Sequence, residues 1–410
     1  MTHLIRYKAH GRKLRLVTCV ALGTLSIGQA SNAVAGATFK IDDTKWLSVG
    51  AGLRTSFTAQ EAAAGTPGNS QWSNNFSLDN IRLYFNGQVH KYIKFEFNTD
   101  CQTCGNGGEV RVLDAIGKFD IDAGYNLWVG RMLVPAERRE MNGPFYSPIY
   151  NVFGAGTPFE PADYNTTIQN NGTSAGSFGR DDGATIWGAF FDKRFQYAVG
   201  FFRGLRGGAN VNDNLLYAQR FAYNFWDVEK NPGYYTSGTY YGKGGDILTV
   251  GVSNQFQDQG AGSTNFHGSF RGTAVDVLME KVLPGGVLTL DGEYKNYGIS
   301  GNYNPNLAAS TPNFNMFEGN AYDVSGMWLF PQKIWIGQAQ PFLRYVNVAP
   351  TASTTREAYE AGLNYIIDGH NAKVSLSWQY GDLLSKGLNY TTGATGEKVN
   401  QMMLGFQYQI

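Results

Sequence analysis

The feature that most constrains the fold is an alternation of apolar and polar residues, which is clearest at the C-terminus. There, one face of the expected strand is apolar, with Met402, Leu404, Phe406, Tyr408 and Ile410. A period of two residues is the pattern of a β-strand. The chain contains sixteen such segments: 45–57, 78–89, 92–99, 109–121, 125–133, 182–191, 194–204, 214–226, 245–256, 267–281, 286–297, 318–330, 339–348, 356–367, 370–381 and 397–410. An even number favours an all-β, transmembrane, antiparallel up-and-down β-barrel, whose closure leaves no backbone edge unpaired in lipid.

The connections between these segments alternate in length. Short connections fall at 90–91, 122–124, 192–193, 283–285 and 368–370. Long polar connections fall at 58–77, 100–108, 134–181, 298–317 and 382–396. Short turns at one end and long loops at the other are typical of outer-membrane barrels. The segment 227–244 departs from this rule, since it is long where a short turn is due. It either extends the flanking strands, or the strand assignment is displaced by one hairpin at this point.

Composition supports a membrane barrel over a helical membrane protein. Charged residues make up 16% of the chain, against roughly 25% in soluble domains. After residue 30 no apolar run approaches the roughly 20 residues that a spanning helix needs. Four strands show an apolar stripe for lipid: Leu47, Val49, Ala51 and Leu53; Ile81, Leu83 and Phe85; Ile93, Phe95 and Phe97; Phe195, Tyr197, Val199 and Phe201. Aromatic residues near strand ends suit interfacial girdles: Trp46, Tyr92, Trp226 and Trp378.

The first thirty-five residues have the anatomy of a secretory signal peptide. Basic residues between Arg6 and Arg15 precede an apolar run over 16–27, and Ala33-Val34-Ala35 forms a cleavage site. We therefore expect a signal peptide at 1–35, a single barrel domain at 36–410, and Sec-type export to the outer membrane of a Gram-negative bacterium. Without the signal, basic residues number 33 − 5 = 28 against 33 acidic ones, a net charge of −5. No basic surface for nucleic acid is expected.

The longest connection, 134–181, is the third long loop, and loops of this length are usually functional. We predict that it folds into the barrel and that its charges form a pore constriction, where opposed charges screen permeating ions. The candidate residues are Glu137, Arg138, Arg139, Glu140, Arg180, Asp181 and Asp182. The alternative is that these charges are solvated at the barrel rim.

The alternation also predicts which charged side chains line the lumen. The candidates are Arg54, Arg82, Lys94, Glu96, Asp114, Lys118, Arg220, Asp291, Glu293, Lys295, Glu360 and Lys373. Rings of one sign give strong ion selectivity, and this set carries both signs. We therefore expect weak selectivity. The same residues could instead form structural ion-pair ladders, and the two roles are compatible.

Two cysteines remain after removal of the signal, Cys101 and Cys104. A disulfide between them is expected in an oxidising compartment. Haem attachment would need a following histidine, a thioredoxin site a βαβ setting, and zinc four ligands, so no cofactor or metal is expected. The three histidines of the mature chain, His90, His267 and His370, form no local catalytic constellation.

Several motifs, in order, resemble one family. Residues 76–87 resemble its early strand, and 127–135, ending in Pro135, resemble the segment before its third loop. Residues 179–188 and 195–200 resemble its loop exit and following hairpin. The family is the phosphate-selective porin O and P group, and the resemblance is clearest over 76–205. It implies a sixteen-stranded, trimeric barrel that passes small hydrophilic solutes. Phosphate-specific members carry an arginine ladder and a lysine-rich lumen, whereas this lumen is mixed and the mature chain is net acidic.

The sequence therefore predicts a porin that is not an enzyme. Small hydrophilic solutes or ions would diffuse passively through it, with outer-membrane lipid and lipopolysaccharide around a homotrimer. Three alternatives remain: a porin-type sheath around an electron-transfer partner, a structural or adhesive surface barrel, and a barrel hydrolase with a buried Ser-His pair.

Overall fold

The fold is taken from a computed structural model of the chain. It describes residues 36–62, 71–101, 109–151, 167–168, 174–175, 179–204, 210–231, 233–262, 264–302, 318–351, 355–383 and 398–410. The predicted signal peptide at 1–35 lies outside the described residues, as does Cys104.

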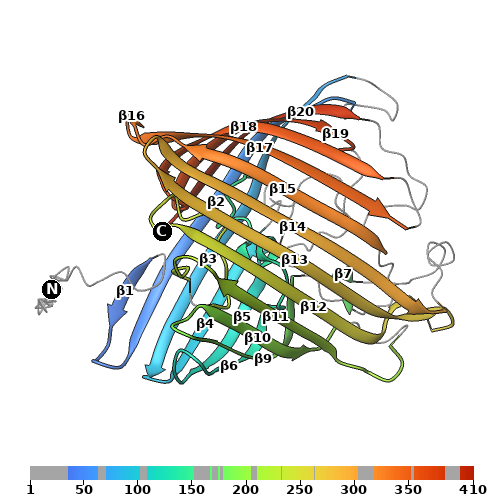
Figure 1. Cartoon of the computed structure of the whole chain (residues 1–410). Helices are drawn as coiled ribbons and strands as arrows, with labels where there is room; N and C mark the ends of the chain where they lie inside the picture. The colour runs from blue at the N-terminus through green and yellow to red at the C-terminus, as the bar shows by residue number, and fades with distance from the viewer. Residues whose placement is uncertain are drawn as a thin grey trace, which may run out of the picture. The chain divides into compact units, whose positions relative to one another are not determined.

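Sixteen antiparallel strands close into a barrel (Figure 1). They are β2 (Trp46–Gln60), β3 (Ser73–His90), β4 (Ile93–Cys101), β5 (Arg111–Asp120), β6 (Asn126–Leu133), β9 (Arg180–Phe190), β10 (Phe195–Phe202), β11 (Leu216–Asn224), β12 (Ile247–Gly262), β13 (His267–Leu283), β14 (Gly286–Gly301), β15 (Gly319–Leu329), β17 (Gly337–Pro350), β18 (Arg356–Asp368), β19 (Ala372–Gly381) and β20 (Val399–Gln409). Closure occurs at β2, where Gly52 lies opposite Gln409 of β20 and Arg82 of β3. Every strand of the ring therefore has two neighbours.

Five smaller elements were not predicted. Strand β1 (Ala37–Lys40) pairs with β2, and β16 (Lys333–Ile334) pairs with β17. Helix α1 (Arg138–Asn142) lies in the third long connection. Strands β7 (Thr167–Ile168) and β8 (Ser174–Ala175) pair only with each other. Among the described residues, no helix has the length and apolar character needed to cross a membrane.

All sixteen predicted strands are confirmed, and most boundaries agree within a few residues. The predicted strands on both sides of the anomalous segment are also present, because β11 ends at Asn224 and β12 begins at Ile247. Neither explanation offered for 227–244 holds. Residues 225–246, called the β11–β12 segment below, contain no strand among their described residues.

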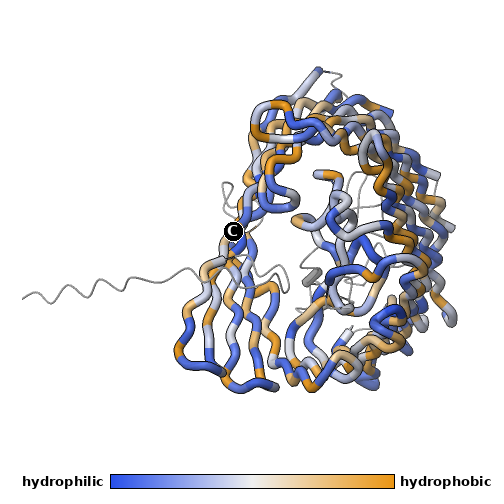
Figure 2. Tube along the Cα trace, turned by 60° about the vertical axis from the view of Figure 1, so that its left-hand side comes forward, coloured by the Kyte–Doolittle hydropathy of each residue, from blue (hydrophilic) through white to orange (hydrophobic). Residues whose placement is uncertain are grey.

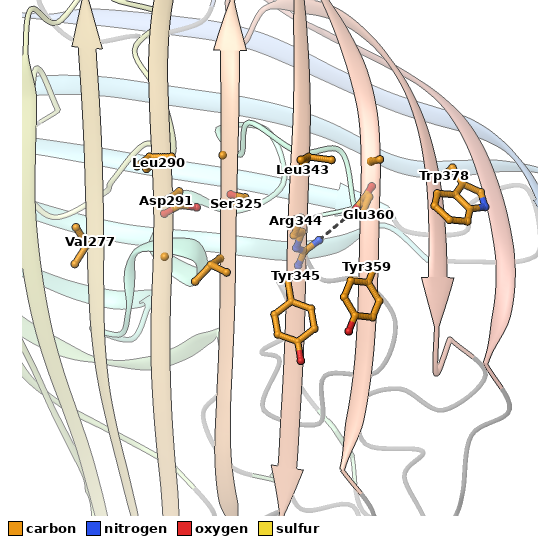
Figure 3. A pocket seen from close by; sticks show the side chains of 14 residues that line it. Val277, Leu290, Asp291, Ser325, Leu343, Arg344, Tyr345, Tyr359, Glu360 and Trp378 are labelled. Atoms are coloured by element: carbon orange, nitrogen blue, oxygen red, sulfur yellow. Dashed lines mark hydrogen bonds and ion pairs between the residues drawn. The ribbon is translucent and has the colours of Figure 1, made fainter.

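Burial separates the two faces of the barrel wall. Large apolar side chains such as Leu53, Leu83, Phe95 and Phe97 are exposed on the outer face, as predicted. Their neighbours along the strands are polar or small and lie on the inner face. Figure 2 shows hydrophobic and hydrophilic positions alternating along the strands. In β17 and β18, Arg344 faces Glu360 on the inner side, and the next pair, Tyr345 and Tyr359, lines an outer apolar groove (Figure 3).

The connections divide the barrel into two ends. One end, called the short-turn end, carries turns such as 91–92, 191–194, 284–285 and 369–371. The other, called the long-loop end, carries the connection that leaves β6 and returns at β9. The β11–β12 segment belongs to the short-turn end, since β11 ends beside the 191–194 turn, where the backbone N–H of Asn224 donates to the carbonyl of Arg194 at 2.8 Å.

Candidate pore constriction

The described start of the third long connection, residues 134–151, is called the α1 segment below. Its backbone carbonyls accept hydrogen bonds from inner-face side chains of seven strands. The donors and acceptors are Gln255 to Pro135 (3.1 Å), Arg220 to Ala136 (3.0 Å), Gln407 to Phe145 (2.8 Å), Lys373 to Ser147 (2.5 Å), Asn364 to Pro148 (2.9 Å), Arg54 to Tyr150 and Arg344 to Asn151. These donors belong to β12, β11, β20, β19, β18, β2 and β17. The α1 segment is thus fixed to most of the inner wall by side chains far away in sequence.

Glycines on the wall make room for the aromatic residues of the α1 segment. A Cβ atom at Gly52 would lie 2.8 Å from the Phe145 ring, and one at Gly405 would lie 2.6 Å from the Tyr150 ring. The guanidinium carbon of Arg54 lies 4.0 Å from the centroid of the Tyr150 ring. Such close approach requires residues without side chains. Larger residues at these two positions would displace the α1 segment from β2 and β20.

Arg138 is buried and carries two ion pairs. Its Nη2 lies 2.6 Å from Oε1 of Glu229, and its Nε lies 3.4 Å from Oδ1 of Asp276. Burial opposes the charge on Glu229, but the Arg138 guanidinium outweighs it and lowers the pKa of Glu229 below its ordinary value of 4.5. The alternative that this charge is solvated at the rim does not hold for Arg138, because its side chain is buried.

Arg139 points to an acidic sector of the wall. Its Nη2 lies 3.0 Å from Oδ2 of Asp291, and it also pairs with Asp323 and Glu293. Three carboxylates converge on one guanidinium, so this sector depends on Arg139 for much of its charge compensation.

The two glutamates that flank these arginines are also buried. Oε1 of Glu137 forms an ion pair with Nζ of Lys295 at 2.7 Å. Glu140 accepts a hydrogen bond from the backbone N–H of Gly179. That second contact joins the start of the third connection to its end, because Gly179 directly precedes β9.

The three predicted residues at the loop exit do not stay together. Arg180 pairs with Asp114 on β5 at 2.7 Å, and Asp181 accepts a hydrogen bond from the backbone N–H of Gly204 at 2.5 Å. Asp182 differs, because its side chain is 50% exposed and pairs with Arg131 on the outer face. The placement of Asp182 in a constriction is thus contradicted, since residues 181 and 182 alternate in direction on β9.

The predicted lumen residues all lie on the inner face, and most are buried. Ion pairs or hydrogen bonds join Lys94 to Asp120 (3.0 Å), Lys118 to Glu96, Arg82 to Asp100 (3.0 Å), Arg220 to Asp276, and Arg54 to Asn80 (2.9 Å). These contacts fit the second role offered for the predicted lumen residues, which is structural pairing along the inner wall. Lys94, Glu96 and Lys118 are half-buried, whereas Lys373 is fully buried.

Sequence reasoning missed several inner-face charges. Asp276, Asp323 and Arg344 lie in predicted strands between outward apolar residues, and Glu280 lies four residues after Asp276 on the same face of its strand. The same alternation could therefore have identified them. Glu229 had no such signal, because it lies outside any strand. Cys101 forms a disulfide, and its expected partner, Cys104, lies outside the described residues.

Comparison with known proteins supports the fold. No protein-family model and no curated protein sequence matches the chain. Among solved structures, OmpT of Vibrio cholerae, expressed in the outer membrane, has a TM-score of 0.52 at 12% identity, covering 91% of this chain and 100% of that one. OprB of Pseudomonas putida, at high pH, has a TM-score of 0.55 at 9% identity, covering 89% and 94%. The chain therefore shares its closed sixteen-stranded barrel with these outer-membrane proteins, and the resemblance to phosphate-selective porins stays a prediction.

Proposed function

We propose that this protein is an outer-membrane porin through which small hydrophilic solutes and ions diffuse passively. The observation that carries the proposal is a closed barrel with an apolar outer face and a charged inner face. Hydrocarbon can solvate only the first of these faces. Lipid and lipopolysaccharide would contact the outer face. Among the described residues there is no group of three or more metal-ligating side chains.

The α1 segment is the proposed constriction. Its hydrogen bonds to seven strands support a position inside the barrel, where it would reduce the free cross-section. The charges around it are mostly paired, as Arg139 is with Asp291 and Lys295 is with Glu137. Paired charges of both signs favour weak ion selectivity over a strong preference. A homotrimer remains an expectation from the family resemblance, and the mixed charges of the inner wall argue against a preference for phosphate.

The contacts of the α1 segment also weigh against the sheath alternative. A sheath needs its interior free for an electron-transfer partner. Here the buried side chains of Arg138, Arg139 and Phe145 on the α1 segment pack against the inner wall instead. A barrel hydrolase would need a nucleophile paired with a base. His370 does contact Ser237, with 3.0 Å between Nε2 and Oγ. Burial lowers the pKa of His370 to about 3, which makes it a poor base, and Ser237 is itself buried.

Proteoliposome swelling tests the proposal. Full-length mature protein would be reconstituted into lipid vesicles, and swelling would be followed in isotonic solutions of neutral sugars of increasing size. We expect swelling rates that fall steadily with solute size, as passive diffusion through a narrow pore requires. Vesicles that swell no faster than protein-free vesicles with every sugar would contradict a diffusion channel.

A further inference from the structure

The β11–β12 segment is unusual for its place in the barrel. It occupies the short-turn end, where neighbouring connections such as 191–194 and 284–285 span only a few residues. Tyr234, Ser237 and Thr239 are buried, as is Glu229. A solvated turn would expose such residues, so this segment contacts the rest of the protein along much of its length.

The β11–β12 segment contacts the α1 segment through side chains and backbone. Glu229 forms the buried ion pair with Arg138, and the carbonyl of Ser237 accepts a hydrogen bond from Nη1 of Arg138 at 2.9 Å. Thr236 donates to the carbonyl of Arg138 at 2.8 Å and contacts Oδ1 of Asn142 at 2.5 Å. The first turn of α1 is therefore held by a segment that enters from the other end of the barrel.

The β11–β12 segment also contacts strands on opposite flanks of β11 and β12, namely β6 and β9 on one flank and β13 on the other. Tyr234 lies with its ring centroid 4.8 Å from that of Trp128 on β6 and 6.1 Å from that of Trp187 on β9. Further along, Thr239 donates to Glu280 on β13 at 2.6 Å. These contacts fix the segment to strands on two separate arcs of the ring.

The far contact of the β11–β12 segment is the turn between β18 and β19. Oγ of Ser237 and the carbonyl of Thr239 each lie 3.0 Å from Nε2 of His370. The ring of Tyr241 lies beside the same imidazole in a tilted arrangement, with 5.0 Å between the centroids. The segment thus runs from the β6–β9 wall to the β18–β19 turn across the short-turn end.

This crossing covers some of the inner wall and leaves another part accessible. Thr289 on β14 is fully buried beside Glu280, the side chain that Thr239 of the segment contacts. On β4 and β5, by contrast, the side chains of Lys94 and Asp120 remain 32% and 22% exposed. The accessible inner wall at the short-turn end therefore includes the β4–β5 sector.

We propose that the β11–β12 segment is a second constriction element, locked to the α1 segment by the Glu229–Arg138 ion pair. It sets the size limit of the pore at the short-turn end and directs solutes along the β4–β5 wall. This inference rests on the proposed porin function, and it assigns a role to a connection that the strand pattern left unexplained.

Single-channel recording of Glu229→Gln tests this lock. The variant keeps the shape of the side chain but removes the charge that holds Arg138. Conductance should rise by roughly a factor of two, because a loosened segment enlarges the free cross-section, and larger polyethylene glycols should enter the pore. Asp246→Asn is the matched control, since Asp246 pairs with exposed Lys281 at the end of the same segment. This control should behave as the wild type.

A cysteine pair keeps the inference testable if Glu229→Gln fails to fold. Asn142→Cys with Thr236→Cys places thiols on side chains that touch, so the pair should form a disulfide in isolated membranes. Absence of that disulfide would overturn the proposed contact. A conducting wild type with unchanged conductance and polymer limit in Glu229→Gln would overturn the second constriction alone. Silence of the wild type and of both variants would reject the porin function itself.

Discussion

Arg138 is the residue at which the two interior segments meet, so its loss should be costly. Arg138→Gln would leave Glu229 buried without its guanidinium partner, whereas Asp276 would keep its ion pair with Arg220. Breaking a buried ion pair costs about 3–5 kcal/mol, and we expect a fall of that order in the free energy of unfolding, measured by urea titration in lipid vesicles. Lys281→Gln removes an exposed partner of Asp246 and should cost at most about 1 kcal/mol. Equal losses in the two variants would contradict this assignment.

Arg139 should influence the ion selectivity of the pore. Arg139→Gln leaves Asp291, Glu293 and Asp323 without their shared cation, so the inner wall becomes more negative. We expect the reversal potential in a KCl gradient to move towards cation preference. Lys281→Gln removes the same charge from a site off the inner wall and should leave the potential unchanged. An unaltered potential in Arg139→Gln would remove this residue from the solute path.

His370 should make stability depend on pH. Burial lowers its pKa from 6.5 to about 3, and Lys373 and Lys243 act in the same direction. The unfolded chain then binds the proton first, so this contribution is complete above the unfolded pKa and is lost as pH falls from 6.5 towards 3. His370→Asn should show a shallower fall of the thermal midpoint between about pH 7 and pH 4. Parallel curves for the two proteins would contradict a buried neutral imidazole.

At the level of elements, the β4–β5 wall should carry the solute path. Lys94→Cys should react with a charged methanethiosulfonate reagent and lower the conductance. Thr289→Cys lies on the inner face of β14 but is covered, so it should react slowly or not at all. Both positions are on the barrel wall, which makes the comparison one of access alone. Faster reaction at position 289 would place the path on the opposite wall.

The strands could be predicted because their signal is local. In β17, Leu343, Arg344 and Tyr345 alternate in direction, and that alternation alone places the arginine on the inner face. The interior segments gave no comparable signal. Arg138 and Glu229 are 91 residues apart, and neither lies in a strand, so no period relates them. Asp182 was misplaced for a related reason: a charge cluster in the sequence was read as one site, although neighbouring strand residues face opposite sides.

At the scale of the whole molecule, a closed wall surrounds an interior that is partly filled by segments from both ends. The wall explains the apolar outer face and the long ladder of strand pairs. The α1 segment and the β11–β12 segment explain why inner-face residues such as Thr289 and Lys373 are buried although they line a barrel. The protein should therefore behave as a narrow channel whose conductance lies below that of an unobstructed barrel of sixteen strands.

The most direct test of this claim is the single-channel conductance of the wild-type mature protein in a planar lipid bilayer over a range of KCl concentrations. We expect discrete, long-lived conductance steps that are small and rise in proportion to salt concentration, as for ions moving through water. A bilayer that stays silent at every salt concentration, with protein shown to be inserted and folded, would contradict it.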